Sequence, residues 1–222
     1  MTAITMPKPH RDRPIEGRMA RWYAANTGEM MQEYIDLARR VAPLLAPGAA
    51  VLEVAPGPGY FCIDLARLGS YDITGLDLSQ SFVRMASQKA AELGLKVKFV
   101  QGSASRMPLP SDSFDFLLCR AAFKNFADPV GALREMCRVL KPGGTGLLID
   151  LKHNASPQAI GRMVDNMKLT PVNRLLTKLT FRFMLVKSAY TREQFEHMLA
   201  QANFSTVDIV EAEIGLEISM RK

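Results

Sequence analysis

The residues best suited to ligand chemistry are two acidic side chains separated by a glycine-rich turn. Glu53 ends a short aliphatic run and is followed by Gly57 and Gly59, and Asp77 lies 18 residues further along. Glycine has no Cβ, so the backbone of such a turn can approach a ligand closely. The first N–H groups of the following helix also lack partners within the helix. A carboxylate before the turn suits a cationic group, so we expect a small polar molecule to bind here.

The same turn lacks residues that phosphate-bearing ligands require. A dinucleotide site needs the pattern G-x-G-x-x-G, so that a pyrophosphate can sit on the helix N-terminus. Here Ala55 precedes Gly57, and Cys62 stands where the third glycine belongs. A phosphate loop needs Gly-Lys-Ser or Gly-Lys-Thr, and neither triplet follows. The turn therefore disfavours a nicotinamide-dependent oxidoreductase.

Strand and helix patterns alternate around this turn. Residues 51–54 are β-branched and aliphatic, which predicts a strand, and residues 61–68 have helical spacing. A second strand runs into Asp77, and a fourth ends before Arg120. Ligands of open α/β sheets bind beyond the carboxyl ends of the strands, so we expect the side chains of Asp77 and Arg120 to face one site. The other predicted strands cover 72–76, 97–100, 114–119, 147–151, 205–210 and 214–220.

Motifs in residues 51–151 resemble the class I S-adenosylmethionine-dependent methyltransferases. E-x-A-P-G-P-G at 53–59 is similar to the first motif of that family, and R-V-L-K-P-G-G at 138–144 is similar to its landmark before the fifth strand. The resemblance implies an α/β fold with a Rossmann-like, seven-stranded, mostly parallel sheet. It further implies the strand order 3-2-1-4-5-7-6 with the last strand antiparallel, helices on both faces and a helical lid.

The resemblance also implies a site for S-adenosylmethionine, with S-adenosylhomocysteine as the product. In this interpretation Asp77 accepts hydrogen bonds from both ribose hydroxyls. Ser103 stands where many relatives carry an acidic residue that binds the adenine amino group. Trp22 and Tyr23 lie in an N-terminal helical segment that closes over the ligand in such proteins, and packing in the core is the alternative for both side chains. The candidate cofactor-binding residues are Glu53, Ala55, Gly57, Gly59, Asp77, Leu78, Ser103, Ala104, Arg120 and Tyr23.

Arg120 and Lys124 are the candidate catalytic residues. Both follow the fourth predicted strand, where the loop is expected to face the reacting methyl group. Two cations there would favour an anionic nucleophile by electrostatic stabilisation. The alternative is that both are ordinary solvated side chains. Methyl transfer from a sulfonium needs mainly in-line positioning and exclusion of water, so no metal site is expected.

The domain organisation is predicted to be a flexible tail at 1–14 and a single domain at 15–222. Within the domain, 15–47 forms a helical cap and 152–188 a helical lid insert. This insert holds seven Lys/Arg and one Asp, so it carries the whole formal net charge of +6. Its basic amphipathic helix could act as a lid over the substrate, as a peripheral membrane contact through 172–187, or as a solvated face.

The acceptor is expected to be a small, partly apolar metabolite. A nucleic-acid enzyme would need a broad basic footprint or a stacking platform, so nucleic acid is disfavoured, although RNA held by the basic insert stays an alternative. A non-catalytic protein that binds S-adenosylmethionine is a second alternative. Cys62, Cys119 and Cys137 lie in apolar segments without metal-type spacing, and they are interpreted as buried hydrophobes. No signal or membrane segment is apparent, which favours the cytoplasm, and the sequence does not indicate an oligomeric state.

Overall fold

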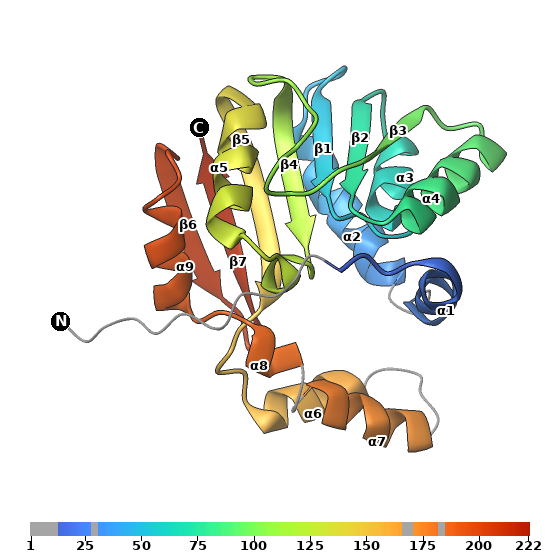
Figure 1. Cartoon of the computed structure of the whole chain (residues 1–222), viewed down its shortest axis with the longest axis vertical. Coiled ribbons are helices and arrows are strands. Elements are labelled where there is room, and N and C mark those ends of the chain that lie inside the picture. Colours follow the sequence, from blue (N-terminus) through green and yellow to red (C-terminus); the bar gives the residue numbers. More distant parts are fainter. Residues whose placement is uncertain (1–12, 28–30, 166–170, 182–184) are drawn as a thin grey trace.

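The computed structural model describes residues 13–27, 31–165, 171–181 and 185–222, which form one seven-stranded sheet flanked by helices (Figure 1). The strands are β1 (Ala50–Val54), β2 (Asp72–Asp77), β3 (Val97–Gln101), β4 (Phe114–Arg120), β5 (Leu140–Leu151), β6 (Thr206–Glu211) and β7 (Gly215–Arg221). Their order is β3-β2-β1-β4-β5-β7-β6. Strands β1 to β5 pair in parallel, whereas β7 is antiparallel to both β5 and β6. The predicted order and the antiparallel last strand are confirmed.

Helices cover both faces of this sheet, as expected. In the described part of the chain the α-helices are α1 (Gly17–Thr27), α2 (Met31–Val41), α3 (Tyr60–Ala66), α4 (Gln80–Glu92), α5 (Pro129–Val139), α6 (Pro157–Asp165), α7 (Pro171–Thr180), α8 (Val186–Ser188) and α9 (Arg192–Leu199), with short 3₁₀ helices η2 (Ala42–Leu44) and η3 (Phe123–Asn125). Helices α2 and α3 pack on one face, and α5 and α9 pack on the other. Helices α6, α7 and α8 lie beyond the carboxyl ends of the parallel strands (Figure 1).

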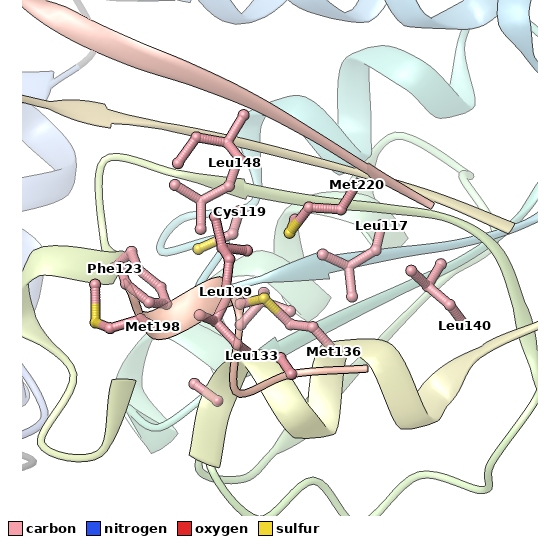
Figure 2. Packing of buried hydrophobic residues seen from close by; sticks show 14 of the residues in the cluster. Leu117, Cys119, Phe123, Leu133, Met136, Leu140, Leu148, Met198, Leu199 and Met220 are labelled. Carbon is pink, nitrogen blue, oxygen red and sulfur yellow. The ribbon is translucent and has the colours of Figure 1, made fainter. Parts of the chain in front are cut away.

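The central strand β4 shows why the sheet needs both layers. Successive side chains of a strand point to opposite faces. Leu117 and Cys119 join the cluster beneath α5 and α9 (Figure 2), whereas Phe116 and Leu118 pack with Phe61 of α3. A strand buried on both faces reads as a continuous apolar run, which is the pattern that predicted this strand.

The predicted helix starts are confirmed by their capping bonds. The Ser79 side chain accepts from Phe82 N at the start of α4, and Asp128 caps α5 in the same way. Thr191 and Gln194 form the predicted capping box of α9. Because α4 begins directly after β2, its first turn stands beside the carboxyl end of that strand.

Parts of the predicted tail and insert lie outside the described residues, namely 1–12, 166–170 and 182–184. The last two residues of the predicted tail, Arg13 and Pro14, line the pocket described below. In the insert, α6 and α7 are joined by an ion pair of 2.8 Å between Asp165 Oδ2 and Lys178 Nζ. No helix in the described part of the chain has both the length and the apolar character needed to cross a bilayer.

Candidate functional site

A pocket of about 180 Å³ opens at the carboxyl ends of β1, β2 and β4, where the sequence placed the site. Its walls come from the glycine turn, the segment before α1, the aromatic faces of α1 to α4, and the loops after β3 and β4. The lining residues are Arg13, Pro14, Ile15, Tyr23, Tyr34, Val54, Ala55, Pro56, Gly57, Pro58, Tyr60, Leu76, Asp77, Leu78, Phe82, Gly102, Ser103, Ala104, Ser105, Arg120, Ala121, Ala122, Asn125 and Phe126.

The two predicted glycines of the turn have different tasks. Gly57 has a φ of +55° and lines the pocket, and a Cβ built on it would meet no atom within 4 Å. Gly59 has a φ of +81° and is not a lining residue; a Cβ there would lie 2.8 Å from Phe99 Cζ and 2.9 Å from Ala86 Cβ. Gly57 therefore leaves space for a ligand, whereas Gly59 allows the start of α3 to pack closely against Phe99 of β3 and Ala86 of α4.

Asp77 connects β2 to the glycine turn. Its Oδ2 accepts from Gly57 N at 2.9 Å, and its Oδ1 accepts from Ser79 N at 2.8 Å. The side chain lines the pocket while the residue is only 8% exposed. Burial raises the pKa of this carboxyl, against the opposing effect of the two backbone bonds. A carboxylate has about four lone-pair positions, so Asp77 can still accept two hydroxyls.

Glu53 lies beneath the turn rather than in the pocket wall. Its Oε2 accepts from Cys62 N at 3.2 Å and from the Cys62 thiol at 2.9 Å. Burial raises the pKa of Glu53 to about 7 and raises the pKa of the Cys62 thiol well above its usual value. The carboxylate thus holds the first turn of α3, a task that the sequence analysis did not give it.

An aromatic wall faces the glycine turn. Tyr23 was predicted and lines the pocket, with its ring centroid 5.6 Å from that of Phe82. Tyr34 and Tyr60 have centroids 5.5 Å apart, and the Tyr60 hydroxyl donates to the Ala24 carbonyl at 2.8 Å. Burial raises the pKa of Tyr34 to about 12, so this phenol stays neutral. The helical spacing in the sequence indicates only that these rings lie on the apolar face of a helix. That they meet at one pocket depends on how the helices pack together.

Arg120 reaches the pocket from the end of β4, as predicted. Its guanidinium carbon lies 4.4 Å from the centroid of the Tyr34 ring, and its Nη2 forms an ion pair with Glu33 of α2. The side chain is 14% exposed, and Nη1 is buried without a hydrogen-bond partner among the described residues. A buried unpaired donor is costly, so this atom is suited to an anionic or carbonyl group of a ligand.

Lys124 does not join Arg120 in the pocket wall. Its side chain is 4% exposed, and Nζ lies 2.9 Å from Asp150 Oδ1 and 2.7 Å from the Ala121 carbonyl oxygen. Asp150 Oδ2 also accepts from Lys124 N at 3.0 Å. The 3₁₀ turn η3 buries Phe123 and Lys124 and leaves Asn125 to line the pocket. The expectation that Lys124 faces the reacting group therefore does not match its position, where it supports the loop from inside.

The remaining predicted residues, Ala55, Leu78, Ser103 and Ala104, all line the pocket. Ser103 Oγ lies 3.1 Å from the Ser105 hydroxyl. No group of three metal-ligating side chains that could hold an ion is present among the described residues.

The segment before α1 is a part of the site that the sequence analysis missed. The Glu16 carboxylate accepts from Gln80 N at 2.8 Å and from Ser81 N at 3.0 Å, where α4 begins. Ser79 Oγ donates to the Ile15 carbonyl at 2.6 Å. A carboxylate at a helix N-terminus is favourable because it meets unpaired N–H groups. These bonds hold Ile15 at the pocket.

The comparisons with known proteins agree with this geometry. Residues 52–148 match the family model described as "Methyltransferase domain". Over 107 residues the chain is 42% identical to a demethylmenaquinone methyltransferase of Deinococcus radiodurans, covering 48% of this chain and 44% of that protein. It is 35% identical over 107 residues to the ubiquinone/menaquinone biosynthesis C-methyltransferase UbiE of Rickettsia massiliae, covering 45% and 43%. The match thus spans less than half the length of these relatives.

The likeness to solved structures extends over almost the whole chain. A crystal structure of a protein described as an S-adenosyl-L-methionine-dependent methyltransferase from Methanococcus maripaludis aligns with a TM-score of 0.75 and 19% identity. It covers 98% of this chain and 97% of that one. At this identity the likeness concerns the fold, including the regions outside residues 52–148.

Proposed function

Because this chain belongs to the class I S-adenosylmethionine-dependent methyltransferases, we propose that it transfers the methyl group of that cofactor to a small, partly apolar acceptor by in-line displacement. The observation that carries the proposal is the position of Asp77, a pocket-lining carboxylate bonded to the glycine turn at Gly57. The cofactor supplies an electrophilic methyl group on a sulfonium.

The residues present fit that cofactor. Asp77 keeps lone pairs for the ribose hydroxyls, and the open space at Gly57 admits a ligand against the backbone. Ser103 and Leu78 line the side of the pocket next to β2 and β3. The unpaired Nη1 of Arg120 offers a donor to an anionic group. These features support the assignment of the pocket to the nucleoside and its amino-acid part.

The chain's own contribution to the reaction is positioning and the exclusion of water. Tyr23, Tyr34 and Phe126 bring aromatic surface to the pocket, which restricts water around the reacting centre and favours an acceptor with an apolar part. Arg120 supplies positive charge that stabilises an anionic nucleophile. Because a similar protein is a demethylmenaquinone methyltransferase, demethylmenaquinone is the first acceptor to test.

Calorimetric titration with S-adenosylhomocysteine tests the cofactor site. We expect Asp77→Asn to weaken binding about 10- to 100-fold, because a hydrogen bond to a charged group contributes about 1.5–3 kcal/mol. Asp72→Asn is the matched control, since Asp72 is exposed at the other end of the same strand and should bind like wild type. Equal affinity for Asp77→Asn and wild type would overturn the assignment.

A turnover assay separates the enzyme from its alternatives. Release of S-adenosylhomocysteine is measured with demethylmenaquinone and with a panel of thiols, phenols and amines. Turnover with any of these supports the proposal. Cofactor binding without turnover supports a non-catalytic binding protein, and salt-dependent RNA retention with methylation of that RNA supports an RNA enzyme.

A further inference from the structure

The outward side of α1 exposes large apolar side chains beside the pocket. Met19 is 60% exposed and Trp22 is 61% exposed. They lie three residues apart, so they are neighbours on the helix surface. Ile15, just before α1, is also exposed and lines the pocket. Apolar side chains gathered at the rim of a site in this way are typical of an interaction surface.

Basic residues accompany these apolar side chains. Arg13, Arg18 and Arg21 are exposed. Glu16 is the sole acidic residue in the sequence from 13 to 25, and its carboxylate is directed to the N-terminus of α4. The exposed side of this segment is therefore positively charged as well as apolar.

Helix α7 presents a second apolar face at the same end of the molecule. Leu175 and Leu179, one helical turn apart, are exposed. Two basic residues beside them, Arg174 and Lys178, share one carboxylate, because both form ion pairs with Asp165 of α6. Both α1 and α7 lie toward the carboxyl ends of the parallel strands, where the pocket opens (Figure 1).

We propose that α1, together with the apolar face of α7, docks on an anionic lipid surface, from which the pocket takes its partly apolar acceptor. The delivery of the acceptor rests on the proposed function, whereas the docking does not. Tryptophan and arginine on one amphipathic helix suit the boundary between headgroups and acyl chains, and arginines are attracted to anionic lipids. Tyr23, next to Trp22 on α1, lines the pocket and connects the two sites.

This surface differs from the predicted contact at 172–187. Within that range Arg174 and Lys178 share one carboxylate, Asp165, which offsets part of its positive charge, whereas α1 presents the exposed Arg18 and Arg21 beside its apolar side chains. Trp22 and the arginines could also meet bases and phosphates, but the exposed aliphatic side chains Met19, Leu175 and Leu179 can do neither. This aliphatic part of the surface favours lipid over RNA.

The chain contains a single tryptophan, Trp22, so its fluorescence reports on this surface directly. Vesicles of phosphatidylglycerol and phosphatidylcholine are compared with vesicles of phosphatidylcholine alone. We expect a blue shift and protection from acrylamide quenching with the anionic vesicles, and a much smaller effect with the neutral ones. An unshifted spectrum, or equal effects with both kinds of vesicle, would overturn the proposal.

Variants read by vesicle co-sedimentation locate the contact. Met19→Ser/Trp22→Ser is expected to lower partitioning about tenfold or more, and Arg18→Gln/Arg21→Gln is expected to lower it about 25-fold on anionic vesicles only. Leu44→Ser is the matched control, because Leu44 is 72% exposed beside the start of β1 at the opposite end of the sheet, and it should partition like wild type. A loss with Leu44→Ser equal to that of the α1 variants would also overturn the proposal.

The fluorescence of Trp22 also distinguishes two other partners that could cover α1. A blue shift that grows with protein concentration without vesicles would assign α1 to a second copy of the chain, and a shift with RNA but not with vesicles would assign it to RNA. S-adenosylhomocysteine affinity, measured without vesicles, should be the same for wild type and Arg18→Gln/Arg21→Gln, because neither arginine lines the pocket. If no variant or wild type binds that nucleoside, the proposed function fails while the vesicle result still decides the docking.

Discussion

The two halves of the sheet each place a carboxylate at the carboxyl end of a strand, but they surround it differently. Asp77, at the end of β2, accepts from backbone N–H groups and lines the pocket. Asp150, near the end of β5, is paired with the buried Lys124 ammonium and lies outside the pocket wall. A carboxylate that meets only backbone donors keeps its charge for a ligand, whereas one neutralised by lysine stabilises the loop above it.

The largest effect expected from this comparison concerns the buried ion pair between Lys124 and Asp150. Lys124→Met should lower the free energy of unfolding by about 3–5 kcal/mol, because it leaves Asp150 buried without its cation. Lys141→Met is the control: Lys141 of β5 pairs with Asp115 of β4, but both side chains are about 40% exposed, so the loss should be below about 1 kcal/mol. Urea unfolding of both variants measures the difference, and equal losses would break the comparison.

The next effect concerns the ligand-facing half. Folding raises the pKa of Glu53 from 4.5 to about 7, so between these pH values the folded protein binds a proton that the unfolded chain does not. The fold therefore loses stability as the pH rises from 4.5 to about 7, and the loss is complete above 7, where Glu53 is ionised in both states. The free energy of unfolding of Glu53→Gln, taken relative to that of wild type, should therefore be about 3 kcal/mol more favourable at pH 8 than at pH 4. Urea unfolding at the two pH values tests this, and a difference that is independent of pH would contradict it.

Arg120 provides a smaller and more specific test. Because its guanidinium lines the pocket while the Lys124 ammonium does not, Arg120→Ala should lower kcat/KM for an anionic acceptor about tenfold and change the pH–rate profile. A Lys124→Arg variant that remains folded should keep the wild-type profile. The result that would refute this distinction is an altered profile for Lys124→Arg beside an unaltered one for Arg120→Ala.

The smallest expected effect is shared by both halves. Ala55 after β1 and Ala121 after β4 have φ values of +58° and +56°, which disfavour a residue with a Cβ. Replacement of either by glycine should raise the free energy of unfolding by up to about 1 kcal/mol, because relief of strain exceeds the greater freedom of glycine in the unfolded chain. Thermal unfolding measures the change; a loss of stability in either variant would show that the alanine is not strained.

The individual strands and the ligand-facing carboxylate could be predicted because their signals are local, whereas the strand order was predicted from the family resemblance. Asp77 follows directly from a strand, and the glycine turn before it is defined by neighbouring residues. The direction of Lys124 could not be predicted, since a 3₁₀ turn decides it and its partner Asp150 is 26 residues away. The same limit applies to Glu16, whose contacts lie 64 and 65 residues further along the chain. Contacts between distant elements, rather than local pattern, complete the site.

The burial of all three cysteines has a practical consequence for handling the protein. Cys62, Cys119 and Cys137 are buried, and burial raises the pKa of each thiol, so the reactive thiolate is scarce in the native state. Alkylating reagents reach these sulfur atoms when the interior opens. The rate of alkylation therefore measures how readily the protein interior opens. Cys62 reports opening on the α3 side of the sheet, and Cys137 reports opening on the α5 side.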